Sequence, residues 1–247
     1  MSILVRTLSD RVFEIVREQI VTGKLSDDMP IRQDALANEL GVSKIPLREA
    51  LARLEQDGLL SSQANRGYVV RPMSTTELDE IYELRLKIEP DAAAFASTAA
   101  TDEDRTNAKE AFKRLDRAAA TDLGQVAICN REFHTALVRP GRRDMTTQLV
   151  ERLAIFAERY VVAHLQPAGR DARAHKEHHE LFEAWLARDA RKVKAILEQH
   201  IRGTADDLRA QLASERSKST GDDECSDREN RSKASRSRKS ITGSARR

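Results

Sequence analysis

The sequence predicts a mainly α-helical fold, in which an N-terminal winged helix-turn-helix is followed by an antiparallel bundle of about six helices. Three observations indicate this fold class. Residues 36–60 have the spacing of two short helices joined by a tight turn, and two β-type runs follow them directly. From about residue 75 almost to residue 213, apolar residues recur at helical spacing between short breaks, without a plausible strand.

Three helices are expected before the β-type runs. The first covers Ser9–Thr22 and ends at Gly23. Its predicted buried stripe consists of Val12, Ile15, Val16, Gln19 and Ile20. The second presents Leu36, Leu40 and Val42 inward, and Gly41 is its C-terminal stop. Ser43 is expected to cap the third helix, whose first turn tolerates Pro46 because the missing N–H has no helical partner there.

The third helix carries an apolar face and a basic face. Leu47, Leu51 and Leu54 recur at helical spacing and are expected to pack inward. Lys44, Arg48 and Arg53 are thereby directed outward. A helix that is basic at its exposed start is suited to the major groove of DNA.

The two β-type runs predict a wing. Leu59–Gln63 and Tyr68–Arg71 are joined by Ala64–Gly67, and Asn and Gly at such a joint indicate a hairpin. Arg66 is expected at its tip, near a minor groove or a phosphate. An ordinary helical hairpin with a small β-ribbon is the alternative interpretation. The predicted DNA-binding residues are Ser43, Lys44, Arg48, Arg53, Arg66 and Gly67.

These motifs carry a resemblance to a known family. Its signature positions are occupied by Leu36-Ala37, Leu40-Gly41-Val42-Ser43, Pro46-Leu47-Arg48-Glu49-Ala50-Leu51, Leu54, Gly58-Leu59 and Arg66-Gly67-Tyr68. Residues 5–72 thus resemble the N-terminal winged-helix domain of the GntR family of bacterial transcription regulators, which implies DNA binding. Lys44 departs from the more usual arginine: it keeps the charge but lacks the two-pronged guanidinium that pairs with guanine, which bears on operator preference.

Length, cysteine content and the lengths of apolar runs indicate where in the cell the protein works. A chain of 247 residues can form a substantial core, and its two cysteines, Cys129 and Cys225, have no disulfide-framework spacing. Apolar runs fall short of the ~18 residues of a membrane span, and the N-terminus lacks a signal-peptide core. A cytoplasmic protein without a membrane partner is expected.

Residues 213–247 differ in composition from the rest of the chain. They contain ten Lys and Arg, six Asp and Glu, and nine Ser, with almost no large apolar residue. Such a segment cannot bury enough surface to fold, so a disordered tail is predicted. It is either an inert appendage or an electrostatic arm that binds DNA phosphates non-specifically.

The region between the wing and the tail, residues 74–212, is expected to form the bundle. Pro72–Ser74 marks the boundary, and the predicted helices are 75–99, 102–120, 123–138, 144–164, 171–187 and 190–212. Its beginning, Tyr82–Glu89, resembles the start of the all-helical C-terminal (FCD-type) domain of the FadR subgroup of these regulators. That resemblance implies an effector-binding and dimerisation domain.

Three histidines occupy positions where apolar residues are expected. His178 shares a helical face with Leu181, Phe182 and Trp185, and His200 shares one with Val193, Ile196 and Leu197. Each lies eleven residues from Asp189, at the turn between their helices, so both imidazoles are expected at the same level, about 16 Å from the turn. Asn130 and His134 lie four apart on a third helix. This set is suited to a divalent metal; hydrogen-bonded core histidines are the alternative.

The subgroup resemblance supports the metal interpretation. In its metal-binding members, an Asp/His pair four apart and two further histidines hold the ion, and these positions correspond here to Asn130, His134, His178 and His200. An amide oxygen in place of a carboxylate still coordinates but adds no charge, so weaker metal binding and a more cationic site are expected. Zn²⁺, Mn²⁺ and Ni²⁺ are all compatible. His175 and His179 lie off the shared face and are therefore weaker candidates for metal ligands.

The predicted function is a homodimeric transcription regulator, most simply a repressor, that binds a palindromic DNA operator and a small carboxylate effector through the metal. Arg85 falls where the family often places an arginine near the ligand; a salt bridge to Glu89 on a solvated face is the alternative. Two other functions are compatible with parts of the sequence. A metalloenzyme would need a general base near the metal, and Glu132 and Glu177 are expected to point away from it. A purely structural, metal-free dimerisation bundle is the other alternative.

Overall fold

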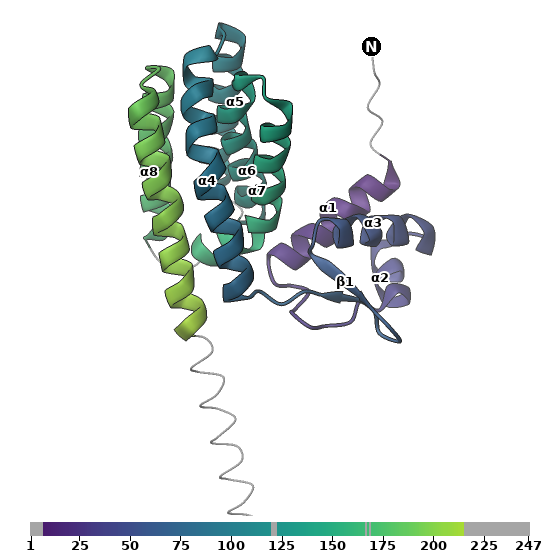
Figure 1. The fold of residues 1–247 in the computed structure, drawn as a ribbon. Coiled ribbons are helices and arrows are strands. Elements are labelled where there is room, and N and C mark those ends of the chain that lie inside the picture. Colours follow the sequence, from purple (N-terminus) through teal and green to yellow (C-terminus); the bar gives the residue numbers. More distant parts are fainter. Residues whose placement is uncertain (1–6, 120–122, 166, 168, 215–247) are drawn as a thin grey trace, which may run out of the picture. The chain divides into compact units, whose positions relative to one another are not determined.

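The computed structural model describes residues 7–119, 123–165, 167 and 169–214 (Figure 1). The N-terminal part contains three helices and a hairpin. Their bounds are α1, Leu8–Val21; α2, Gln33–Leu40; α3, Lys44–Gln56; β1, Leu60–Gln63; and β2, Gly67–Val70. The predicted winged helix-turn-helix is therefore confirmed, with the predicted order of elements.

Helix α1 shows why periodicity alone places a stripe only approximately. Thr7 and Asp10 form a reciprocal capping box that fixes the start of the helix. Val12, Val16 and Ile20 are buried as predicted, whereas Ile15 is 42% exposed. Phe13 is buried instead, because it packs into the hydrophobic core of this part of the chain, and the Arg53 guanidinium of α3 lies over its ring, 4.4 Å from the centroid. The prediction for Ile15 was wrong because the buried stripe is rotated toward Phe13.

The turn between α2 and α3 has the predicted glycine. Gly41 has φ +65°, a left-handed conformation that favours glycine. Ser43 occupies the N-cap position of α3, but its side chain makes no capping hydrogen bond to the described residues, so that part of the prediction was wrong. The three leucines predicted to face inward on α3 are fully buried: Leu47, Leu51 and Leu54. They pack one face of α3 into the core and leave the start of the helix exposed.

The hairpin is antiparallel, with Leu60 paired to Val70 and Gln63 paired to Gly67. Three residues form its turn, and Asn65 at the centre has φ +64°, which asparagine tolerates better than most residues. Arg66 comes directly after Asn65, at the tip as predicted.

The second part of the chain is the helical bundle (Figure 1). Its elements are α4, Thr75–Ala99; α5, Asp102–Ala119; α6, Leu123–Val138; a 3₁₀ turn η1, Arg139–Gly141; α7, Asp144–Leu165; α8, Arg170–Leu186; and a last helix over residues 190–214. The described ends agree with the predicted helices to within two residues. Helix α4 continues through Pro90, which has no N–H to donate to the preceding turn.

The core of the bundle lies where α4, α6 and α8 meet. Its largest fully buried side chains include Tyr82, Phe133, Leu137, Leu181 and Trp185. None of the helices in the described part of the chain is long and apolar enough to span a membrane. The chain forms two compact units that are divided after Asp206, within the last helix. The predicted domain boundary at residues 72–74 is not tested by this division and stays a prediction. The predicted tail lies outside the described residues, apart from residues 213 and 214, which end the last helix.

Candidate DNA-binding surface and metal centre

The start of α3 is exposed and basic. Arg48 is exposed and forms no ion pair with any residue that the structure describes, so its guanidinium is available to a ligand. Lys44 is paired with Asp34 of α2, but both side chains are mostly exposed, and such pairs are weak. Ile45 lies between them in the helix and is 72% exposed, which is unusual for a large apolar side chain. These three residues are all exposed within the first five residues of the helix.

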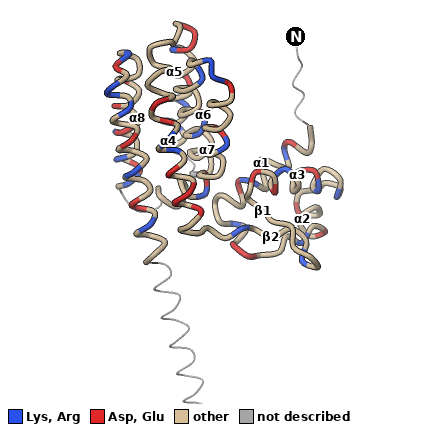
Figure 2. Tube along the Cα trace, in the orientation of Figure 1, with Lys and Arg blue, Asp and Glu red and all other residues tan. Residues whose placement is uncertain are grey.

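The other predicted DNA contacts are placed differently. Arg53 donates to Asp10 of α1 at 2.6 Å and stacks on Phe13, so it holds α3 against α1. Arg66 donates to Gln63 Oε1 at 3.1 Å and to the carbonyl oxygen of Asp28 at 3.2 Å. The neighbouring Gly67 has φ +71° and ends the turn. Figure 2 shows Lys and Arg interspersed with Asp and Glu along the helices of the bundle.

The bundle brings three predicted histidines together. One nitrogen from each of His134, His178 and His200 lies within 4.8 Å of the others. The ring centroids of His178 and His200 are 4.7 Å apart, so the two imidazoles are level, as their equal spacing from Asp189 predicts. His134 and His178 are buried, and the His200 side chain is 10% exposed.

The spacing of the imidazoles fits a metal ion. The Nε2 atoms of His134 and His178 are 3.4 Å apart. Two histidine nitrogens at ~2.0–2.1 Å from a tetrahedral ion are about 3.3 Å from each other. Octahedral sites have similar separations, so the geometry is compatible with Zn²⁺, Mn²⁺ or Ni²⁺ and does not choose among them.

Two carboxylates bond to the outer nitrogens of this cluster. Glu89 of α4, 1% exposed, pairs through Oε1 with Nδ1 of His134. Glu177 of α8 pairs through Oε2 with Nδ1 of His200 at 2.6 Å. Glu177 was predicted to point away from the histidines, and this was wrong, because its side chain reaches across to the next helix. Glu132 does point away, toward Arg114, 3.0 Å from it.

The pKa values of His134 and His178 are lowered, which keeps both imidazoles neutral and able to bind a metal. Burial lowers the pKa of His134, although Glu89 opposes this. Burial and the neighbouring imidazoles of His200 and His134 lower the pKa of His178 well below its usual value. Both rings are therefore neutral at neutral pH, the form that coordinates metals. Burial alone would raise the pKa of Glu89, but Arg85 and His134 hold it well below its usual range, so Glu89 is ionised.

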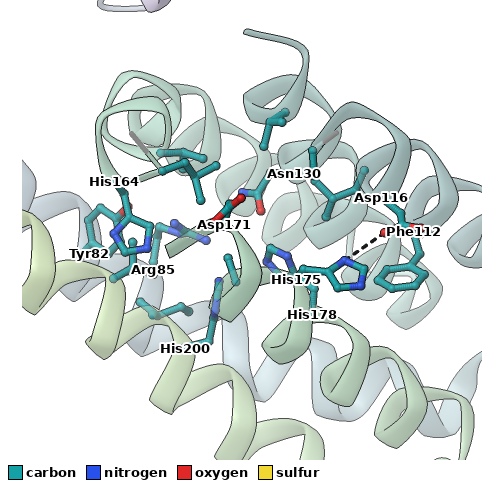
Figure 3. Close-up of a pocket in the computed structure, with 18 residues that line it drawn as sticks. Tyr82, Arg85, Phe112, Asp116, Asn130, His164, Asp171, His175, His178 and His200 are labelled. Carbon is teal, nitrogen blue, oxygen red and sulfur yellow. Dashed lines mark ion pairs between the residues drawn. The ribbon is translucent and has the colours of Figure 1, made fainter. Parts of the chain in front are cut away.

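A pocket opens beside the cluster (Figure 3). Asn130, His178 and His200 extend into it from α6, α8 and the last helix, while Tyr82, Arg85 and His164 line one side. Its volume is about 50 Å³, enough for several water-sized groups. Arg85 is buried and donates from Nε to Glu89 Oε2 at 3.0 Å. The salt bridge that was the alternative interpretation of Arg85 therefore forms, but in the core and not on a solvated face. Burial raises the pKa of Tyr82 to about 12, so its hydroxyl stays protonated.

The other two histidines of α8, His175 and His179, lie away from the cluster. His175 is about half exposed and its Nδ1 lies 3.0 Å from Asp116 at the far side of the pocket. His179 is exposed and packs edge-on to Phe112.

Comparison with known proteins identifies the family. Residues 8–70 match the bacterial regulatory proteins of the gntR family, and residues 80–203 match the FCD domain. The chain belongs to the GntR family of transcription regulators. It is accordingly a DNA-binding regulator with an FCD domain, not an enzyme.

Relatives of this GntR regulator match over most of their length. The chain is 30% identical over 207 residues to an uncharacterized HTH-type transcriptional regulator, BphR, of Paraburkholderia xenovorans, covering 80% of this chain and 83% of the relative. It is 27% identical to the transcriptional repressor GlaR of Escherichia coli, covering 75% and 89%. The solved structure of Escherichia coli McbR has a TM-score of 0.68 at 25% identity, covering 83% of this chain and 99% of that one.

Four residues at the histidine cluster and pocket of this GntR regulator were not assigned to the site from the sequence. His164 and Tyr82 line the pocket, and Glu89 and Glu177 bond to the histidines. Only Glu89 and Glu177 had a feature in the sequence that could have pointed to them. Each is an acidic residue on a helix that also carries a predicted site residue. Their partners lie 45 and 23 residues away, so the contacts depend on helix packing.

Proposed function

We propose that this GntR regulator is a homodimeric repressor whose affinity for a palindromic operator is controlled by a small carboxylate that binds at a metal in the bundle. The proposed metal ligands are Asn130, His134, His178 and His200. The observation that carries this proposal is the convergence of three imidazole nitrogens within 4.8 Å, in a buried position beside a pocket. A cytoplasmic location follows from a function on DNA.

The polar groups of the pocket favour an anionic effector. A divalent ion would bring two positive charges, and Asn130, unlike an aspartate, would place no negative charge in direct contact with it. Arg85 and the protonated Tyr82 hydroxyl are donors on the pocket wall. The small volume of the pocket favours a carboxylate with few atoms, and Arg85 is our candidate for binding it.

Control of DNA binding needs an effector that binds one arrangement of the recognition helices better than another. Arg48 and Lys44 at the start of α3 are the proposed contacts to base edges, and Arg66 and Gly67 of the wing the proposed contacts to the neighbouring backbone. Ser43, whose hydroxyl is not used as a helix cap, is available to a phosphate. GlaR is named as a repressor, which favours repression over activation here.

Metal content across a set of histidine variants tests this proposal. The wild-type chain is expected to take up about one Zn²⁺, Mn²⁺ or Ni²⁺ per chain, measured by mass spectrometry, and to melt at a higher temperature with metal. His134→Ala, His178→Ala and His200→Ala should lose the metal and any effector response while still binding the operator. His179→Ala is the matched control and should keep the metal and the effector response, and His175→Ala should keep the metal.

The alternative of a metal-free structural bundle makes the opposite prediction. In that case the wild-type chain stays metal-free in excess of all three ions, and the three core histidine variants lose stability without losing any bound metal. Size-exclusion chromatography with light scattering checks the dimer in each variant.

A further inference from the structure

Glu89 and Glu177 hold two of the three clustered imidazoles in the same way, although they belong to different helices. Glu89, on α4, bonds to Nδ1 of His134, and Glu177, on α8, bonds to Nδ1 of His200. An ionised carboxylate accepts hydrogen bonds and cannot donate them, so each bond places the imidazole proton on Nδ1. The lone pair of each ring is then on Nε2, on the opposite side of the ring from the carboxylate.

We propose that Glu89 and Glu177 are positioning residues that fix the tautomer and orientation of His134 and His200 and supply the negative charge that Asn130 does not. This inference rests on the proposed metal site. Ligating histidines commonly donate their second N–H to a carboxylate, which fixes the ring and raises its basicity. The four proposed ligands are all neutral, so the negative charge nearest the ion would come from the two carboxylates. Arg85 partly offsets the charge of Glu89, and Arg173 partly offsets that of Glu177.

Arg85 belongs to the same arrangement. It binds Glu89 through Nε to Oε2 at 3.0 Å and through Nη2 to Oε1 at 3.4 Å, and both residues are buried. This two-point contact fixes the Glu89 carboxylate in the plane in which Oε1 meets His134. Arg85 therefore acts on the metal site through Glu89, besides its proposed contact to the effector.

Glu177 offers the cleaner test because its side chain is 30% exposed, so its substitution leaves no buried group unpaired in the core. Glu177→Gln keeps the shape and removes the charge. Glu180→Gln is the matched control, since it makes the same change on the same helix, at a side chain that is 53% exposed and faces Lys176. Glu89→Gln is the second variant, but loss of the Arg85 pair puts its folding at risk.

Two measurements on the full chain decide the proposal. Competition with a chromogenic chelator should show Zn²⁺ binding weakened about 10- to 100-fold by Glu177→Gln, the usual effect of losing such a partner, and unchanged by Glu180→Gln. Long-range ¹H–¹⁵N spectra of the metal-free, histidine-labelled chain should show His134 and His200 protonated on Nδ1. Glu177→Gln should shift His200 alone toward a mixture of tautomers, a change that a merely structural role would not produce.

Equal Zn²⁺ affinity in Glu177→Gln, Glu180→Gln and the wild type, with an unchanged His200 tautomer, would overturn the proposal. If Glu89→Gln does not fold, the Glu177 comparison decides alone. If the wild type binds no metal, the proposed function fails, while the tautomer spectra still decide whether the carboxylates fix the rings. The two failures are therefore distinguishable.

Discussion

Trp185 of α8 donates its indole N–H to the backbone carbonyl oxygen of Leu137 on α6, at 2.9 Å, in the fully buried core. His178 lies two turns before Trp185 on α8, and His134 lies one turn before Leu137 on α6. This bond therefore fixes the two helices at the level from which both histidines meet.

Replacing Trp185 by Phe should test that relationship. Phenylalanine keeps an aromatic ring but cannot donate to Leu137, so we expect the free energy of unfolding to fall by about 1–3 kcal/mol, the usual cost of leaving a buried polar group unpaired. Zn²⁺ affinity should fall as well, because α6 and α8 lose a fixed register. Urea unfolding and chelator competition measure the two effects. Leu149→Ala, at a half-exposed side chain of α7, is the control and should change neither.

Arg48 is the residue on which operator recognition should depend most. It is exposed at the start of α3 and has no partner among the described residues that would have to be displaced. We expect Arg48→Ala to weaken specific operator binding by at least the ~1–3 kcal/mol of a two-point contact to a base. Lys87→Ala removes a similar charge from the bundle and should have no such effect. Unchanged operator affinity of Arg48→Ala in a gel shift would show that α3 is not the recognition helix.

The local features of this fold were predictable from sequence. The bundle helices begin and end within two residues of the predicted positions, because Pro, Gly and Asp break a strong helical period. The meeting of His178 and His200 was predictable because both lie eleven residues from the same turn, and a helix rises by a fixed amount per residue.

Contacts that depend on packing were not predictable. Phe13 and Ile15 flank the same stripe of α1, and the packing of α1 on its neighbours, Arg53 of α3 among them, decides that Phe13 is covered. Glu177 leaves α8 on a face beside that of His178, yet its flexible side chain reaches His200. Helical spacing predicts the direction in which a side chain leaves the helix. It does not predict which partner the end of a long polar side chain reaches.

Ile45 offers a test of base readout that does not involve charge. Its exposed side chain lies beside Arg48 at the start of α3, and an apolar group in the major groove contacts the methyl group of thymine. Ile45→Ser should lower affinity for a thymine-containing operator by a factor of about four, from the ~0.8 kcal/mol of one buried methyl-sized group. Replacing single thymines by deoxyuracil should lower wild-type affinity equally at one position and leave the variant unaffected there. Equal losses in both proteins at every position would contradict this contact.

Residues 215–247 are expected to be dispensable for the fold. Their composition offers no apolar stripe that could pack on a helix. Deleting them should leave the melting transition, the dimer and operator specificity intact. If the segment binds phosphates, non-specific affinity and the slope of affinity against salt concentration should both fall, which fluorescence anisotropy on random duplex DNA measures. A less cooperative melting transition after truncation would show that the segment is structural.

Asn130→Asp tests the charge of the proposed metal site most directly. Asn130 is buried, lines the pocket, and lies one helical turn before His134. Aspartate has nearly the same shape and adds a negative charge, so Zn²⁺ binding should become tighter, by at least tenfold for ~1.4 kcal/mol of added attraction. The same charge reduces the attraction of the site for an anion, so binding of a small carboxylate such as acetate or lactate, followed by calorimetry on the metal-loaded chain, should weaken. Asn107→Asp on α5 is the control for a charge added elsewhere on the bundle and should alter neither affinity. If Asn130→Asp binds Zn²⁺ no better than the wild type, Asn130 does not face the ion, and the three histidines with their two carboxylates would form the whole site.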